Sequence, residues 1–127
     1  RKFTVNGNET QLGQVMDNLI LNASSFIPPD GKITISCLLQ MDKIILHVDN
    51  EGPPIPERKL ETIFERFYSE RPESERFGLH SGLGLSISRQ IIRDHKGAIF
   101  ARNITSEKGQ HLHVRFTIIL PAGEGTK

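Results

Sequence analysis

The segment DNLILNASSF at residues 17–26 decides the fold of this chain, because it lies in a run where apolar residues recur at helical spacing. Asn8 suits the N-cap of this helix, with Gln11 three positions later, and PPDG at 28–31 stops it. We therefore expect an amphipathic helix that ends before residue 28. Its apolar face consists of Leu12, Val15, Met16, Leu19, Ala23 and Phe26.

Asn18 and Asn22 stand four positions apart on this helix, so their side-chain amides project from the same face. Two neutral oxygens on a rigid face can meet a hydrated Mg²⁺, which takes a few protein ligands and keeps waters and phosphates for the rest. Asparagines on a helix are also common as plain solvated residues. The pair alone therefore leaves both interpretations open.

Outward from this helix, alternating and apolar runs predict the remaining elements. A second helix starts at Pro56, and a third starts near Gly84 and ends in a basic turn at Lys96. The expected strands span residues 2–5, 32–39, 43–50, 98–104 and 112–120, and the short QMD connection at 40–42 makes a hairpin of the second and third. The second helix should bury Leu60, Ile63, Phe64 and Phe67. This order predicts an α/β (α+β) two-layer sandwich, with a mixed sheet of about five strands covered on one face by three helices.

Composition limits the classes of function. The chain has 127 residues, 36% of them hydrophobic, which suits one domain over residues 1–127 with a flexible tail at 121–127. A formal net charge of +1 gives no reason to expect nucleic acid or membrane contact, and no apolar stretch approaches the ~20 residues of a membrane span. Cys37, the only cysteine, shares a strand face with Ile33 and Ile35, so we expect it buried, in a reducing cytoplasm. The absence of an initial methionine suggests a piece of a longer protein.

Two glycine-containing segments add candidate ligand contacts. In VDNEGPPIP, Asn50 emerges from a strand end and Gly52 lets the backbone pass close to a ligand, although a plain turn has the same composition. In GLHSGLGLSI, Gly82 and Gly84 precede an apolar helix, whose N–H groups and dipole can face phosphate oxygens; a simple helix boundary is the alternative. The charged segment 68–81 lacks periodicity and is long for a connector, which predicts a mobile lid.

The order and spacing of these segments resemble the catalytic domain of histidine kinases in the GHKL ATPase superfamily, over about residues 5–121. The family's asparagine box, N-L-x-x-N-A, is matched by Asn18, Leu19, Asn22 and Ala23. The resemblance implies that Asn22 holds Mg²⁺, that Asn18 supports the phosphates of ATP and that Phe26 lies near the base.

The family's first glycine box, D-x-G-x-G-I-P, is matched by NEGPPIP with two departures, since Asn50 replaces the aspartate and Pro54 the second glycine. An asparagine can still accept one hydrogen bond from the adenine amino group, so we expect weaker or less selective purine binding. The second glycine box is matched from Gly82 to Leu85, with His80 in place of a preceding glycine. The nucleotide contacts that the resemblance implies are Asn18, Asn22, Phe26, Asn50, Gly52, Pro54, Ile55, Tyr68, Arg76, Gly82, Leu83, Gly84 and Leu85.

The resemblance implies a domain that binds Mg-ATP and donates the γ-phosphate to a histidine on a separate dimerisation helix. The partner would be a response regulator of a two-component system, and the full-length protein would be anchored in the bacterial inner membrane with this domain in the cytoplasm. Ser25 stands where the family often has a basic residue, so a lid arginine, Arg71 or Arg76, would neutralise phosphate charge. None of the five histidines is followed by Asp or Glu, so the acceptor and its base should lie outside this chain.

Two alternatives stay open. The departures at Asn50, Pro54 and His80 are compatible with a nucleotide-gated interaction module that binds ATP poorly and acts through its partner. The other alternative is an anti-sigma serine kinase of the same superfamily. The long lid argues against it, as does IFERFY at 63–68, which resembles the phenylalanine box of histidine kinases.

Overall fold

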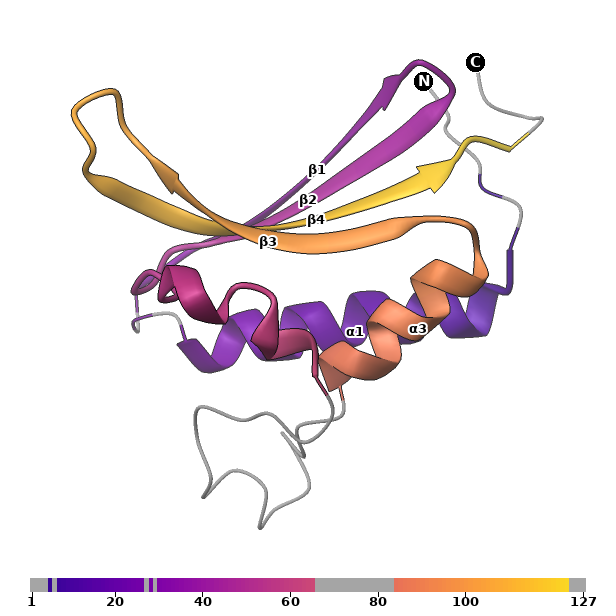
Figure 1. The fold of residues 1–127 in the computed structure, drawn as a ribbon, viewed down its shortest axis with the longest axis horizontal. Helices are drawn as coiled ribbons and strands as arrows, with labels where there is room; N and C mark the ends of the chain where they lie inside the picture. Colours follow the sequence, from indigo (N-terminus) through magenta and orange to yellow (C-terminus); the bar gives the residue numbers. More distant parts are fainter. Residues whose placement is uncertain (1–4, 6, 27, 29, 66–83, 124–127) are drawn as a thin grey trace, which may run out of the picture.

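The protein folds as one layer of helices against one antiparallel sheet (Figure 1). The structure is a computed structural model that describes residues 5, 7–26, 28, 30–65 and 84–123. In chain order its elements are α1 (Glu9–Phe26), β1 (Ile33–Gln40), β2 (Lys43–Asn50), the 3₁₀ helices η1 (Glu57–Lys59) and η2 (Thr62–Phe64), α3 (Gly84–Asp94), β3 (Ala98–Thr105) and β4 (His111–Pro121). The two-layer fold predicted from the sequence is confirmed.

The sheet differs in detail from the expected mixed sheet of about five strands. Its described part has four strands in the order β1-β2-β4-β3, and every neighbouring pair is antiparallel. Strand β3 would lie parallel to β2 if the two paired directly, but β4 inserts between them and pairs with both. The predicted strand at residues 2–5 falls almost entirely outside the described residues.

The β1–β2 connection is a two-residue hairpin turn, as expected from the QMD segment. Met41 and Asp42 both have positive φ, 49° and 65°, which is the backbone that two-residue hairpins require to match the twist of their strands. The turn sets the register that places Ile33 opposite Asn50 at the far end of the hairpin. The carboxyl end of β2 is thereby brought beside the start of β1.

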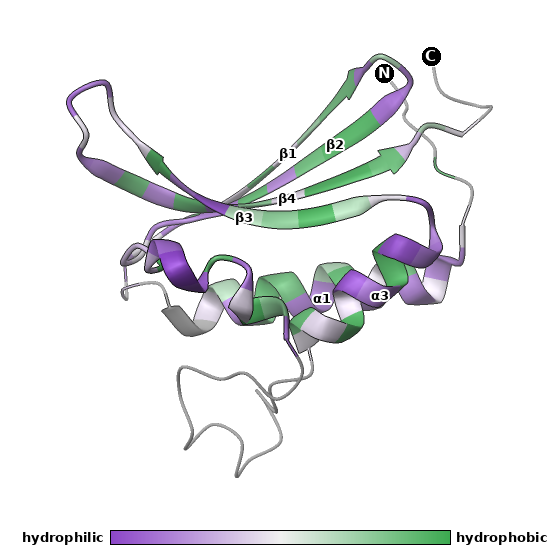
Figure 2. Cartoon of the chain, in the orientation of Figure 1, coloured by the Kyte–Doolittle hydropathy of each residue, from purple (hydrophilic) through white to green (hydrophobic). Residues whose placement is uncertain are grey.

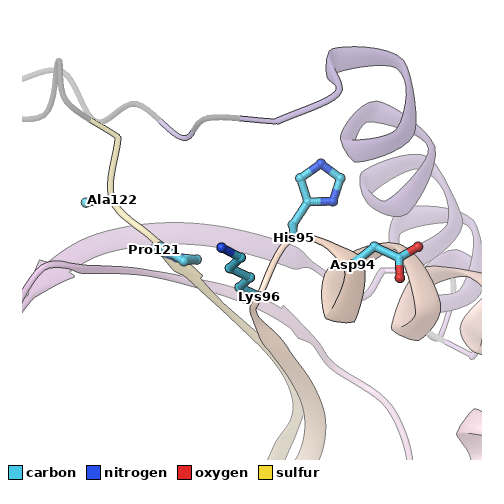
Figure 3. Close-up of a pocket in the computed structure, with 5 residues that line it drawn as sticks. All are labelled: Asp94, His95, Lys96, Pro121 and Ala122. Carbon is cyan, nitrogen blue, oxygen red and sulfur yellow. The ribbon is translucent and has the colours of Figure 1, made fainter.

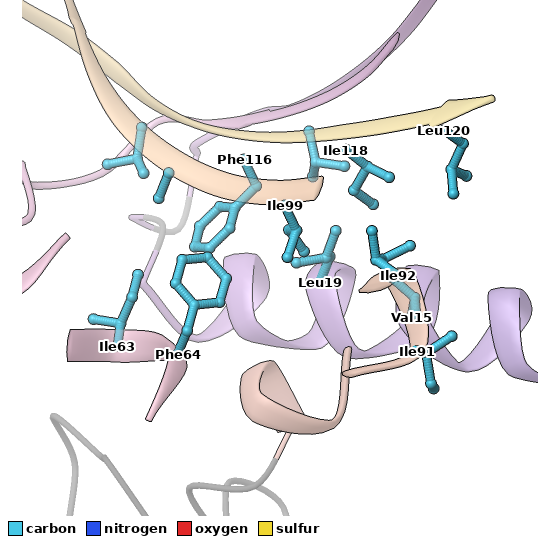
Figure 4. Close-up of a cluster of buried hydrophobic side chains, with 13 residues drawn as sticks. Val15, Leu19, Ile63, Phe64, Ile91, Ile92, Ile99, Phe116, Ile118 and Leu120 are labelled. Atoms are coloured by element: carbon cyan, nitrogen blue, oxygen red, sulfur yellow. The ribbon is translucent and has the colours of Figure 1, made fainter. Parts of the chain in front are cut away.

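The core lies between α1, α3 and the inner face of the sheet (Figure 4). Figure 2 shows the apolar side of both helices turned to the strands. Leu19 is 1% exposed and Val48 fully buried, and burying a side chain of this size contributes about 1.5–3 kcal/mol. The rings of Phe64 and Phe116 meet edge to face, with centroids 6.1 Å apart. The core as a whole contains Val15, Leu19, Val48, Ile63, Phe64, Ile91, Ile92, Ile99, Ala101, Val114, Phe116, Ile118 and Leu120.

Helix α1 begins and packs as the sequence predicts. The Asn8 side chain accepts a hydrogen bond from the Gln11 N–H at 3.0 Å, so Asn8 is the N-cap. The Asn8 backbone N–H donates to Nε2 of His95 at 3.0 Å, and Nδ1 of His95 lies 2.8 Å from the Ile91 carbonyl. Since a carbonyl can only accept, the proton sits on Nδ1 and His95 is neutral here. The start of α1 is therefore joined to the end of α3.

The expected second α-helix is replaced by the two 3₁₀ turns. Only eight residues lie between Pro56 and Glu65, too few for an isolated α-helix to be stable in water. Tertiary contacts determine the conformation of this segment instead, because Ile63 and Phe64 are both buried. Phe67 lies outside the described residues. Arg89 of α3 holds this segment, with an ion pair to Glu61 and its guanidinium carbon 5.5 Å from the centre of the Phe64 ring.

Two further expectations are wrong. Cys37 is exposed, because β1 is an edge strand that extends beyond the helices, and Ile35 on the same strand face is 48% exposed. Alternation identified a shared face, but it did not reveal that the helices leave that face open. The predicted flexible tail also begins too early. Pro121 belongs to β4, and the Ala122 N–H donates to the Asp42 carbonyl at 2.9 Å.

Among the described helices, none is both long and apolar enough to cross a membrane.

On its outer face the sheet carries a cluster of charged and polar side chains. Asp49 receives two hydrogen bonds from Arg115, at 2.8 and 3.0 Å, and His113 Nε2 lies 3.3 Å from the same carboxylate. Nδ1 of His47 lies 3.2 Å from the Thr117 hydroxyl. This outer cluster is partly shielded from water.

The outer cluster predicts a pH-dependent contribution to stability. Burial and the nearby Arg115 and Arg102 lower the pKa of His47, and Asp49 only partly opposes them. The unfolded chain then binds a proton at His47 at higher pH than the folded chain, so stability should fall as pH drops through about 6.5. His47→Gln should reduce the loss of unfolding free energy between about pH 7.5 and pH 5, measured by urea titration. An unchanged pH dependence in the variant would contradict this assignment.

Candidate nucleotide site

Among the predicted site residues that the structure describes, Asn18 of α1 and Gly84 at the start of α3 lie side by side, and α1 also contacts β2, the strand that ends at Asn50. Gly84 is the first residue of α3, and a Cβ added to it would lie 3.8 Å from Cγ of Asn18. Ile55 and Leu85 pack against the central core from the loop and from α3. The asparagine segment and the second glycine segment, 66 residues apart in sequence, therefore meet in space as the sequence predicts.

Asn18 is joined to the first turn of α3 by a three-way hydrogen-bond network. Its Nδ2 donates to the Gly84 carbonyl and to the Ser88 hydroxyl, both at 3.2 Å. The Ser88 hydroxyl donates to the same Gly84 carbonyl at 2.8 Å, and Ser88 is completely buried. This network holds the amino end of α3, with the N–H groups of its first turn, against α1.

Asn22 follows one turn later on the same side of α1 and is half-buried. Phe26 is the last residue of α1, and its side chain lies outside the described part of the structure. Of the remaining expected contacts, Tyr68, Arg76, Gly82 and Leu83 also lie outside it, as do Arg71 and His80. Their roles stay predictions.

Asn50, the last residue of β2, is a buried amide at the edge of this site. It is 3% exposed and lies between Ile33 and Val114 in the register of the sheet. No side-chain hydrogen bond is found between Asn50 and the rest of the described chain. Since no described protein group bonds to its side-chain oxygen or nitrogen, both are available to a ligand at this position. Its chemistry suits the amino group and ring nitrogen of a purine.

The loop that follows Asn50 is braced by two side chains from other strands. The amide of Asn103 on β3 makes two bonds to the backbone of Ile55, accepting from its N–H at 2.9 Å and donating to its carbonyl at 2.7 Å. Nε2 of His111 lies 2.8 Å from the Gly52 carbonyl, so it is protonated and donates. Sequence reasoning missed both residues. The signal that could have identified Asn103 was its position two residues after Ala101 and four after Ile99, on the strand face that those two apolar residues share.

An open hollow of about 300 Å³ lies at the other end of α3 (Figure 3). Asp94, His95 and Lys96 line it from the helix end, and Pro121 and Ala122 from the end of β4. An eleven-residue helix separates it from Gly84, a length of roughly 16 Å. The hollow is therefore separate from the asparagine site.

An asparagine beside a helix start and a buried amide at a strand end, on a two-layer fold, are features that the resemblance to histidine kinase catalytic domains leads us to expect. A family model described as "Histidine kinase-, DNA gyrase B-, and HSP90-like ATPase" matches residues 7–124, so the chain belongs to this family. The family recognised from the sequence is thereby confirmed.

The relatives place the chain among sensor histidine kinases. It is 46% identical over 123 residues to the sensor protein ChvG of Agrobacterium fabrum, covering 96% of this chain and 21% of ChvG. The mycobacterial sensor histidine kinase MprB superposes with a TM-score of 0.79 at 27% identity, over 94% of this chain and 76% of that one. Histidine kinase ThkA, in complex with the response regulator protein TrrA, gives a TM-score of 0.72 at 35% identity, over 94% and 30% of the two chains. The chain thus spans about a fifth of the length of ChvG, as the 21% indicates.

The loop brace generates a prediction that needs no ligand. Asn103→Ala removes both hydrogen bonds to Ile55 and leaves two backbone groups without partners, so the free energy of unfolding should fall by about 2 kcal/mol. Hydrogen exchange at the Ile55 amide should accelerate as the loop loosens. Gln110→Ala, an exposed change in the nearby β3–β4 connection, is the control and should alter stability by less than about 0.5 kcal/mol. Equal effects of the two substitutions would show that the brace is unimportant.

Proposed function

We propose that this chain is the catalytic domain of a two-component sensor kinase, which binds Mg-ATP and presents its γ-phosphate to a histidine on a separate dimerisation helix. The proposal rests on two observations: Asn50 is a buried residue whose amide makes no side-chain hydrogen bond within the described chain, and Asn18 contacts Gly84 at the start of α3. A nucleotide site needs a polar group that bonds to the base and a helix start that binds the phosphates. The Asn50 amide and the first turn of α3 can supply them.

The residues fit a bound Mg²⁺ through the chemistry of their donors. Amide oxygens are hard, neutral ligands of the kind that Mg²⁺ accepts beside water and phosphate, and Asn22, one turn from Asn18 on α1, is the proposed ligand. Mg²⁺ would neutralise charge on the phosphates. The protein's own contributions are position and electrostatics, since phosphoryl transfer requires little covalent chemistry from the enzyme. The first turn of α3 supplies N–H groups to the phosphate oxygens, and the braced loop from Gly52 through Pro54 to Ile55 lies beside the base.

The partners follow from the proposed reaction. The acceptor histidine would lie on the protein's own dimerisation helices, outside the residues present here, and the phosphoryl group would pass from it to a response regulator. The complex of ThkA with TrrA supports a partner of this class. We take residues 1–127 as one catalytic domain, on the cytoplasmic side of a membrane-anchored sensor. The nucleotide-gated interaction module is the second candidate, favoured by Asn50 and Pro54 where the resemblance expects an aspartate and a glycine.

Asn50→Asp tests the proposed adenine contact. A carboxylate accepts a stronger, charge-assisted hydrogen bond from the adenine amino group, so ATP affinity measured by calorimetry should rise by about 1 kcal/mol. Without nucleotide the same variant should be less stable, because the buried carboxylate has no partner. Gln110→Glu makes the same chemical change at an exposed position and should leave ATP affinity unchanged. A clear loss of affinity in Asn50→Asp would mean that Asn50 donates to the base instead.

The second prediction of the proposal is that this chain alone cannot phosphorylate itself. The four described histidines are engaged in the fold: His47 with Thr117, His95 with Asn8 and Ile91, His111 with Gly52, and His113 beside Asp49. His80 lies outside the described residues, and Ser81 after it is no general base. Labelled γ-phosphate should stay off this chain and appear on the dimerisation helices of the same protein when they are supplied separately. Labelling of a histidine of this chain would overturn the assignment, and absence of transfer despite tight ATP binding would favour the interaction module.

A further inference from the structure

Ser88 occupies an unusual place for a serine, in the middle of the contact between α1 and α3. It is 0% exposed and lies in the helix turn that also buries Ile91 and Ile92. Its hydroxyl reaches two groups, the Gly84 carbonyl at 2.8 Å and Nδ2 of Asn18 at 3.2 Å. The first contact is local to α3, whereas the second joins α3 to the asparagine segment of α1.

The hydrogen-bond chemistry determines which way round the Asn18 amide must stand. The Gly84 carbonyl can only accept, so the Asn18 atom at 3.2 Å from it must be the amide nitrogen. Ser88 has a single hydroxyl proton, which it donates to the same carbonyl. Towards Asn18 its oxygen is therefore an acceptor, and both contacts of Asn18 use the amide nitrogen. An inverted amide would place an oxygen against the Gly84 carbonyl.

This orientation has a consequence for what Asn18 can offer to a ligand. The two acceptors are each 3.2 Å from Nδ2 of Asn18 and only 2.8 Å from each other, so they lie on one side of the nitrogen, and the nitrogen side of the amide faces α3. Its Oδ1 lies on the opposite side of the amide, and no hydrogen bond from the described part of the chain reaches it. An amide oxygen can bind a cation or a metal-bound water, but it cannot donate to a phosphate oxygen. This differs from the direct phosphate contact that the family resemblance implies for Asn18.

We infer that Ser88 is a positioning residue that turns the Asn18 amide, so that its oxygen faces the Mg²⁺ side of the nucleotide site beside Asn22. The inference rests on the proposed function and deepens it. Without the Ser88 acceptor, the Asn18 nitrogen is held by the Gly84 carbonyl alone. The buried hydroxyl thus acts on the cation through Asn18, and not by contact with the ligand.

The inference separates two roles that a simple binding measurement would mix. A purely structural serine would, when removed, lower stability and weaken nucleotide binding equally with and without metal. A serine that orients a metal-facing oxygen would weaken the metal-dependent part more than the metal-independent part. The informative quantity is therefore the Mg²⁺ enhancement, defined as the dissociation constant of ATP in EDTA divided by that in excess Mg²⁺.

The experiment measures this enhancement by calorimetry for the 127-residue chain and its Ser88→Ala variant, with thermal unfolding in parallel. Ser88→Ala should reduce the Mg²⁺ enhancement by about tenfold, the effect of one hydrogen bond to the orienting group, on top of any loss of ATP affinity in EDTA that follows from a looser first turn of α3. Ser24→Ala is the matched control, because Ser24 also donates to a carbonyl four residues earlier, at 2.8 Å from Ile20, but is exposed and contacts no asparagine. It should retain the full enhancement.

A double-mutant cycle tests whether Ser88 acts through Asn18. In an Asn18→Ala background, Ser88→Ala should cause no further loss of Mg²⁺ enhancement. If Ser88→Ala does not fold, Ser88→Cys keeps nearly the same size with a weak acceptor and serves in its place. Additive effects in the cycle, or an enhancement equal to that of the unmodified protein, overturn the inference. Absence of ATP binding by the unmodified protein would instead reject the proposed function.

Discussion

The antiparallel contact between α1 and α3 is the constraint on which the rest of the structure depends. Apolar side chains supply its area, with Val15 and Leu19 on α1 against Ile91 and Ile92 on α3. Burial of this kind is favourable but not directional, so it does not by itself decide how far one helix slides along the other. Polar contacts make that choice at two points. Asn8 meets His95 at one end of the pair, and Asn18 meets Gly84 at the other.

These two contacts connect packing to function. Sliding α3 by one turn would move it by about 5.4 Å and break the hydrogen bonds between the helices, which join Asn8 to His95 and Asn18 to Gly84 and Ser88. Leaving a buried donor or acceptor unsatisfied costs more free energy than forming its hydrogen bond gains. The alignment of the two helices is therefore specific. Since Gly84 is the first residue of α3, the same alignment puts the positive end of the helix beside Asn18. The core and the site are two consequences of one helix contact.

The sequence predicted the elements that depend on local pattern and missed those that depend on distant partners. Helical periodicity and the Asn8 cap gave α1, and alternation with a short connector gave the β1–β2 hairpin. Exposure of Cys37 could not be predicted, because alternation does not say how far the helices extend over an edge strand. The 3₁₀ turns before Glu65 depend on tertiary burial of Ile63 and Phe64, which no local spacing encodes.

The same distinction applies to the site. Asn18, Asn22, Asn50 and Gly84 could be selected because their spacing resembles a known pattern, and the structure brings Asn18 and Gly84 into contact. Asn103 and His111 carry no such pattern, and each acts on a backbone group at least 48 residues away in sequence. The sheet register brings them there, because β3 and β4 run beside the loop that leaves β2. Loop bracing of this kind is therefore visible only once the strand order is known.

Three asparagines at this end of the fold differ in the hydrogen-bonding capacity that the protein itself uses. Asn103 uses both its oxygen and its nitrogen on Ile55, so it has least left for a ligand and serves as a brace. Asn18 uses its nitrogen alone and keeps an oxygen, whereas Asn50, although 3% exposed, makes no side-chain hydrogen bond within the described chain. A buried amide is tolerated without a protein partner where a ligand completes it. The unused hydrogen-bonding capacity thus increases from Asn103 to Asn18 and then to Asn50. By this order Asn103 shapes the site, whereas Asn18 and Asn50 keep groups that can bind the cation and the base.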